Sequence, residues 1–112
     1  MISRHSFFRQ TSEPEEPSEE EIAQIRASSA QERAAVEVMV LRECAHRWQK
    51  VAKLVGDLMN EFEMAYPHLP LSMLPATMEK LEDLGKVEIA GDPWAMNYSE
   101  IRLVPLKADA VS

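Results

Sequence analysis

The sequence predicts a mainly α (α+β) protein, with a helical body containing a long amphipathic helix, a helix-turn-helix and a C-terminal two-stranded β-hairpin. Three observations predict this class. Residues 29–64 contain no proline and carry apolar side chains at helical spacing. Prolines then interrupt the pattern, and a second helical pattern follows it. After Gly85 apolar and polar residues alternate, which is typical of strands.

The chain of 112 residues is the size of one domain, which we expect to span residues 18–106. Residues 1–17 are rich in proline and glutamate towards their end and predict a flexible acidic tail, and residues 107–112 predict a loose one. Phe7 and Phe8 are the only strong apolar pair of the first tail. Two alternatives stay open for them, docking onto the body or a second copy and simple disorder.

The location of the protein is constrained by its start and by its cysteine content. The first residues hold no uninterrupted apolar run, which argues against a cleaved secretory signal, and no stretch is apolar enough to span a bilayer. The single cysteine, Cys44, excludes an internal disulfide and is expected to be a small buried residue. A cytoplasmic location fits these observations, and we expect no membrane association.

Two capping boxes predict where the first two helices begin. Ser18 is followed at the third position by Glu21, and Ser29 by Glu32, so each serine and glutamate can satisfy two free backbone N–H groups. The first box predicts a short helix over 19–27, with its two isoleucines facing inward. The second predicts a long helix to about residue 64, either unbroken or bent near Gly56. The apolar side of that long helix holds Leu41, Cys44, Trp48, Val51, Val55, Leu58, Met59 and Phe62.

The second half of the domain predicts a helix-turn-helix and a hairpin. The prolines at 67 and 70 must end the long helix, Ser72 is a candidate N-cap for the next one, and Gly85 is a candidate C-terminal cap. Residues 87–89 and 101–103 alternate as two short strands should. They are joined by a turn at 90–93 and a loop that contains tryptophan and tyrosine.

This order of elements is similar to that of a winged helix, in which the second helix of the helix-turn-helix reads DNA and the hairpin is the wing. Residues 47–104 also resemble a bacterial domain family of unknown function. The resemblance is carried by RWQKVA at 47–52, LEDLGKVE at 81–88, GDP at 91–93 and EIRL at 100–103. It implies a winged-helix-like fold, and it transfers no active site because the family has no established activity.

The charges argue against DNA as the partner. The net charge of −7 disfavours attraction to nucleic acid. The helix that would read DNA carries three acids and one base, namely Glu79, Glu82, Asp83 and Lys80. A winged-helix transcriptional regulator therefore stays an alternative function.

The sequence shows no catalytic motif, and we expect no enzyme activity, no cofactor and no metal. Glu43 and His46 form one Glu-x-x-His pair, whereas di-iron bundles use two such pairs with further glutamates. His68 lies between prolines and is expected to be a loop residue.

Two groups of residues are candidates for contact with a partner. The first is a basic stripe on the predicted long helix, made of Arg42, His46, Gln49, Lys50 and Lys53. Its alternative is the solvated back of an amphipathic helix. The second is the loop with Trp94, Met96 and Tyr98, which either anchors a partner or folds back over the core.

These observations favour a non-enzymatic protein-interaction module that binds a protein partner or forms a homodimer. A DNA-binding regulator is one alternative. The other is an acidic immunity-type inhibitor of a basic toxin, because a small acidic chain suits a basic target.

Overall fold

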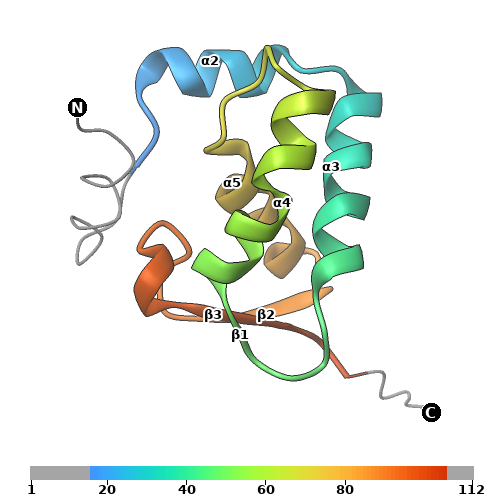
Figure 1. Cartoon of the computed structure of the whole chain (residues 1–112), viewed down its shortest axis with the longest axis vertical. Helices are drawn as coiled ribbons and strands as arrows, with labels where there is room; N and C mark the ends of the chain where they lie inside the picture. The colour runs from blue at the N-terminus through green and yellow to red at the C-terminus, as the bar shows by residue number, and fades with distance from the viewer. Residues whose placement is uncertain (1–15, 106–112) are drawn as a thin grey trace.

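The structure is a computed structural model, and it describes residues 16–105 (Figure 1). Three helices stand side by side on a small antiparallel sheet, and a further helix lies across their far end. The elements in chain order are α2 (Glu19–Ala27), α3 (Ala30–Glu43), β1 (Gln49–Lys50), α4 (Val51–Ala65), α5 (Met73–Asp83), β2 (Val87–Ala90), the 3-10 helix η1 (Met96–Tyr98) and β3 (Glu100–Leu103). The mainly helical α+β class is confirmed. The predicted tails fall almost entirely outside the described residues, as do Phe7 and Phe8.

Both predicted capping boxes are confirmed. The backbone N–H of Glu21 donates to the Ser18 hydroxyl (3.1 Å), and the Ser18 N–H donates to the Glu21 carboxylate (3.0 Å). The pair Ser29 and Glu32 makes the same two bonds at 3.0 and 2.9 Å. Local chemistry alone therefore sets the first residues of α2 and α3.

The predicted long helix is wrong in its middle. The chain leaves the helical conformation at Cys44, and α4 begins only at Val51. The break is not at Gly56, which is exposed inside α4. Among residues 16–105, nothing beyond its chain neighbours and its own helix backbone lies within 4 Å of where a Cβ would be.

The break has a tertiary cause. Residues 49 and 50 form β1, the edge strand that pairs with β3. The backbone N–H of Leu103 donates to the carbonyl of Ala45 (2.7 Å), and that of Val51 donates to the carbonyl of Ser99 (3.0 Å). These bonds, to residues 58 and 48 positions away in the chain, replace the helical bonds that the local pattern favoured.

The sheet has the order β1-β3-β2. The predicted hairpin of β2 and β3 is confirmed, with Ile89 opposite Ile101 and Glu88 opposite Arg102. The third strand, β1, was missed because its residues were assigned to the long helix. The two helices and the hairpin follow one another in the predicted order, with the unpredicted β1 directly before α4.

The turn between α4 and α5 falls at the predicted prolines, and α5 ends as predicted. Gly85 has φ +78°, its N–H donates to Glu82, and the N–H of Lys86 donates to Leu81. This is a Schellman cap. Ser72 precedes α5 as predicted, but its hydroxyl makes no cap bond and is buried without a partner among the described residues.

The core lies between α3, α4, α5 and the inner face of the sheet. Cys44 is buried in it, as predicted. Ile25 packs against the core, whereas Ile22 is exposed, so only one of the two α2 isoleucines faces inward as expected. Within residues 16–105, no helix combines the length and the apolar character needed to cross a membrane. The side chains buried most completely are Phe62, Leu54, Leu58, Met73, Leu74, Met78, Leu81, Ile101, Val36, Val40, Val51 and Val55.

Candidate partner-binding face

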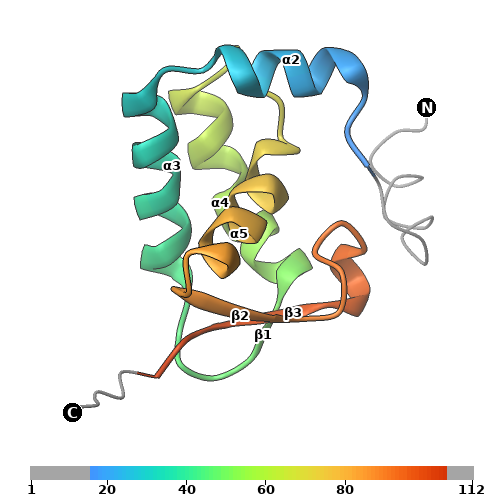
Figure 2. The ribbon, with the colours of Figure 1, turned by 180° about the vertical axis from the view of Figure 1, so that it is seen from behind.

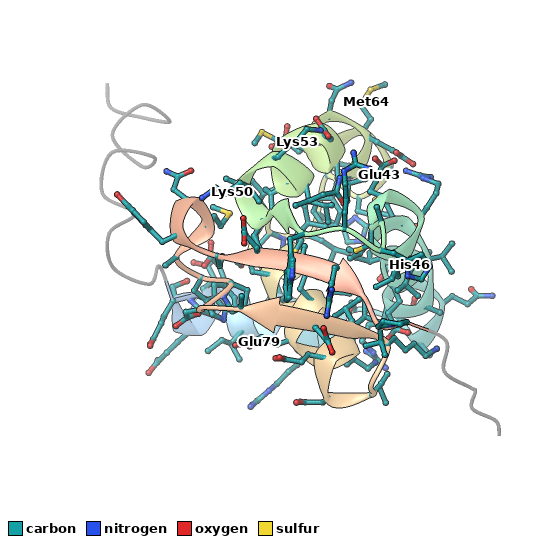
Figure 3. The ribbon with its side chains drawn as sticks, turned by 90° about the horizontal axis from the view of Figure 1, so that it is seen from below. Glu43, His46, Lys50, Lys53, Met64 and Glu79 are labelled. Carbon is teal, nitrogen blue, oxygen red and sulfur yellow. The ribbon has the colours of Figure 1, made fainter. Side chains whose placement is uncertain are left out.

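The basic stripe does not exist as a single helical face. Arg42 lies in the last turn of α3, His46 in the connection, Lys50 in β1 and Lys53 in α4. Figure 3 shows Lys50 and His46 near opposite ends of the sheet, and Lys53 away from both on α4. The stripe required an unbroken helix, and the break at 44–50 separates its members. Gln49, its fifth member, points towards the inner side of the sheet at the position opposite Ile101.

Two of the four basic residues of the stripe already form ion pairs within the chain. Arg42 makes a two-pronged contact with Glu61 of α4 (2.7 and 3.3 Å), which raises the pKa of its guanidinium. Lys53 pairs with Asp57 one turn along α4 (2.7 Å). The first contact joins α3 to α4 and the second spans one turn of α4. Both side chains are therefore engaged within the domain.

The aromatic loop mostly folds back onto the core. Trp94 and Met96 are buried, and only Tyr98 is exposed. The loop is shaped by its own bonds, because the carboxylate of Asp92 accepts from the backbone N–H of Trp94 (2.9 Å). At Gly91, φ is +89° and an added Cβ would lie 2.9 Å from the Tyr98 carbonyl oxygen. Of the two alternatives for this loop, folding back is the one observed for Trp94 and Met96.

A different group of side chains lies together on the outer face of the sheet. Side chains alternate between the two faces of a strand, so Arg102 and Glu88, which are opposite each other, both point away from the buried Ile101. The Arg102 guanidinium lies 4.6 Å from the centre of the Trp48 ring, and its Nε donates to Glu88 (2.8 Å). We call Trp48, Arg102 and Glu88 the sheet-face ladder.

Trp48 is accessible and held in place at once. It is 39% exposed, although the sequence placed it on the apolar side of a helix. The cation–π contact with Arg102 fixes its ring from one side, and Glu88 fixes Arg102 in turn. The helices cover the other face of the sheet and leave this face open (Figure 3).

Positive charge surrounds the ladder. Arg47 precedes Trp48 and Lys86 precedes β2, and both are exposed with no ion pair to any residue in 16–105. Lys50, in β1, reaches the carbonyl oxygen of Asn97 at 3.5 Å. Glu100, opposite Lys50, and Glu88 are the carboxylates on these strands. The sheet face is therefore more basic than the acidic chain as a whole.

The surface of α5 has the opposite character. Its three acids, Glu79, Glu82 and Asp83, are all exposed. Its one lysine, Lys80, pairs with Glu37 of α3 (2.7 Å). The helix that would enter a DNA groove therefore offers negative charge and a lysine that is already engaged.

The residues that the sequence raised as candidates for metal or thiol chemistry are dispersed in the structure. Residues 16–105 contain no cluster of three or more metal-ligating side chains. Burial raises the pKa of the Cys44 thiol to about 11, so little thiolate is present at neutral pH. Glu43 and His46 no longer share a helix, since His46 lies in the 44–48 connection.

His68 meets a partner that the sequence did not indicate. Its Nε2 lies 2.7 Å from the carboxylate of Glu32, the residue that closes the Ser29 capping box. The backbone N–H of Ser29 and then His68 lower the pKa of Glu32. His68 is thus a loop residue, as predicted, that also ties the turn after α4 to the start of α3.

The sheet-face ladder was missed because it requires the strand β1. Trp48 itself and the alternation after Gly85 were both visible in the sequence, but nothing local pairs residue 48 with residue 102. Comparison of the chain with models of protein families, with curated proteins and with solved structures found no match.

Proposed function

We propose that the chain is a non-enzymatic protein-interaction module and that its sheet-face ladder contacts a protein partner. The observation that carries the proposal is the accessible Trp48, held between solvent and a guanidinium that is itself bonded to Glu88. Tryptophan and arginine are the residue types most enriched among side chains that dominate binding energy.

The ladder supports binding because its geometry is set before a partner arrives. A free tryptophan or arginine loses about 0.5–1.5 kcal/mol of side-chain freedom when an interface immobilises it. Here the ring and the guanidinium already restrain each other at 4.6 Å. Part of that cost is therefore met in the unbound protein.

The surrounding charges define the kind of partner. Arg47, Lys50 and Lys86 flank the ladder, so a partner that brings an apolar group to Trp48 and carboxylates around it would be complementary. An acidic protein surface with one apolar anchor fits this face. The net charge of −7 would repel such a partner elsewhere, which favours docking at the sheet.

The proposal is tested with the full chain as bait in extracts of the source cells, followed by affinity measurement with any purified prey. Trp48→Ala and Arg102→Ala should each weaken binding, the first by about 2 kcal/mol, or roughly thirtyfold. Met64→Ala is the matched control, because Met64 is a more exposed apolar residue on α4, at 75%. A prey that binds Trp48→Ala as tightly as wild type would remove the ladder from the interface.

The DNA-binding alternative is supported by the order of elements alone, and the charges of α5 oppose it. A gel-shift assay with random duplex DNA at low salt separates the two functions, because non-specific binding is electrostatic. We expect no retardation. A shift that weakens steeply with salt and is reduced in Lys86→Ala would support the regulator instead.

The inhibitor of a basic toxin would use a different surface. Its contacts would involve the acids of α5, so charge reversal at Glu79 and Glu82 would abolish binding while Trp48→Ala would leave it intact. The same bait experiment therefore distinguishes this alternative from the sheet-face ladder.

A further inference from the structure

Helix α2 is anchored to the domain but hardly packed against it. None of its nine residues is buried. It lies across the end of the helical body and projects beyond it, as Figures 1 and 2 show from opposite sides. The anchor is its C-terminal end, where Ser28 is buried and the Arg33 guanidinium donates to the Ser28 carbonyl. The direction of α2 is thus fixed while most of its surface stays open.

One open face of α2 forms a shallow hollow. It is lined by Glu19, Ile22, Ala23, Arg26 and Ala27. Their spacing of 0, 3, 4, 7 and 8 places all five on one side of a helix. Ile25, which packs against the core, lies on another side. The face therefore combines one exposed isoleucine with two alanines small enough to allow close approach of another helix.

The charges on this face are arranged symmetrically about its apolar centre. Glu19 lies in the first turn and Arg26 in the last, on either side of Ile22 and Ala23. The two charged residues are seven positions apart, or about 10 Å along the helix. Reversing the helix exchanges the positions of acid and base and leaves the apolar centre in place.

From this symmetry we propose that α2 pairs with α2 of a second copy of the chain in an antiparallel homodimer. Glu19 of each copy would then lie opposite Arg26 of the other, and Ile22 opposite Ala23. A parallel pair would instead place each charge beside its own like. A two-fold axis through the contact makes the interface self-complementary and closed, so association stops at the dimer.

The contact is small, which sets the expected strength. Stable interfaces bury about 800 Å² per partner, and a nine-residue helix about 14 Å long covers less. We therefore expect a weak dimer, with a dissociation constant of about 10–100 µM. This surface is separate from the sheet-face ladder, so the two proposals stand or fall independently.

Sedimentation velocity of the full chain from about 10 µM to 1 mM provides the test, a range chosen to bracket that affinity. Wild type should shift from monomer to dimer as concentration rises. Glu19→Arg alone gives arginine opposite arginine, and Arg26→Glu alone gives glutamate opposite glutamate. Each variant should dimerise about tenfold more weakly, and high salt should reduce the difference.

The decisive sample is an equimolar mixture of the two variants. In a mixed pair, the arginines of one chain face the glutamates of the other at both ends, so dimerisation should return to about the wild-type level. Circular dichroism of each variant checks that it is folded. A helix-dipole effect of the substitutions would not be repaired by mixing.

Three results would overturn the proposal. One is a wild-type chain that stays monomeric to 1 mM, which includes the case in which its own N-terminal segment covers α2. Another is a dimer that both single variants form with wild-type affinity, since the interface would then lie elsewhere. The last is a mixture of folded variants that dimerises no better than either variant alone.

Discussion

The two tryptophans of the chain lie in contrasting environments. Trp48 was expected on the apolar side of a helix and is 39% exposed beside Arg102. Trp94 was expected either to anchor a partner or to fold back over the core, and it folds back, with 9% of its surface exposed. Both environments depend on β3, which pairs with β1 after Trp48 and follows the loop that holds Trp94.

A small sheet thus decides which of the two tryptophans is exposed to solvent. Near Trp48, bonds to residues 99 and 103 draw the chain out of the helix. Near Trp94, the Gly91 turn and the Asp92 carboxylate curl the loop back over the body. Local apolar spacing describes neither outcome.

The largest expected effect separates the two tryptophans by stability. Trp94→Ala should lower the free energy of unfolding by about 3 kcal/mol, because it removes a large buried side chain. Trp48→Ala should cost about 1 kcal/mol or less, since its ring is partly exposed and loses mainly the Arg102 contact. Urea unfolding followed by circular dichroism measures both. Equal losses would contradict the assigned environments.

Replacing one glycine in the loop before Trp94 and one in helix α4 should change the stability of the protein in opposite directions. Gly91→Ala should destabilise by about 2 kcal/mol, because an alanine there has positive φ and meets the Tyr98 carbonyl at 2.9 Å. Gly56→Ala should stabilise by up to about 1 kcal/mol, because the position is helical and open. Thermal unfolding of both variants gives the comparison. A stabilising Gly91→Ala would show that the turn is not built as described.

The restraint on Trp48 can be tested without a partner. In a Trp94→Phe background, Trp48 is the only tryptophan and can be excited selectively. Arg102→Ala should then increase the amplitude of the fast anisotropy decay of Trp48. The expected loss of stability is small, about 0.5–1 kcal/mol, as for exposed cation–π contacts. Arg102→Lys is the control, because it keeps the charge without the planar group. Unchanged anisotropy in Arg102→Ala would mean that the guanidinium does not hold the ring.

The smallest expected effect concerns the start of α3, which local chemistry set. The pKa of Glu32 is lowered by the Ser29 backbone N–H and then by His68. A carboxylate with a lower pKa in the folded state stabilises the fold above its unfolded pKa, and that contribution is lost as the pH falls through the folded value. The ordinary pKa of a glutamate is 4.5. As the pH falls below that value, the melting temperature of wild type should therefore decrease more than the melting temperature of Glu32→Gln. Parallel curves from pH 6 to 3 would contradict this assignment.

Sequence alone predicted the parts of the fold that short-range chemistry determines. The capping serines gave the beginnings of α2 and α3, Gly85 gave the end of α5, and alternation gave β2 and β3. It did not predict β1, because two residues carry no periodicity and their pairing with β3 is a long-range event.

The candidate site could not be predicted because it depends on β1. The sequence indicated Arg42, Lys53 and Trp94 as partner-contacting residues, yet the first two are paired within the chain and the third is buried. Lys50 and the exposed Tyr98 stay accessible. Trp48 and Arg102 meet only when β1 and β3 form, so no spacing rule along the chain connects them.

Cys44 caps α3 where the chain turns towards β1, and its thiol is buried with a pKa raised to about 11. The thiolate is the form that attacks alkylating reagents, so Cys44 should react very slowly in the folded protein. Reaction then requires a local opening that releases the end of α3 and its bonds to β3. The labelling rate, compared with that of the unfolded chain, measures the free energy of this opening. Because Cys44 is the single cysteine of the chain, its labelling reports how often the end of α3 separates from the sheet.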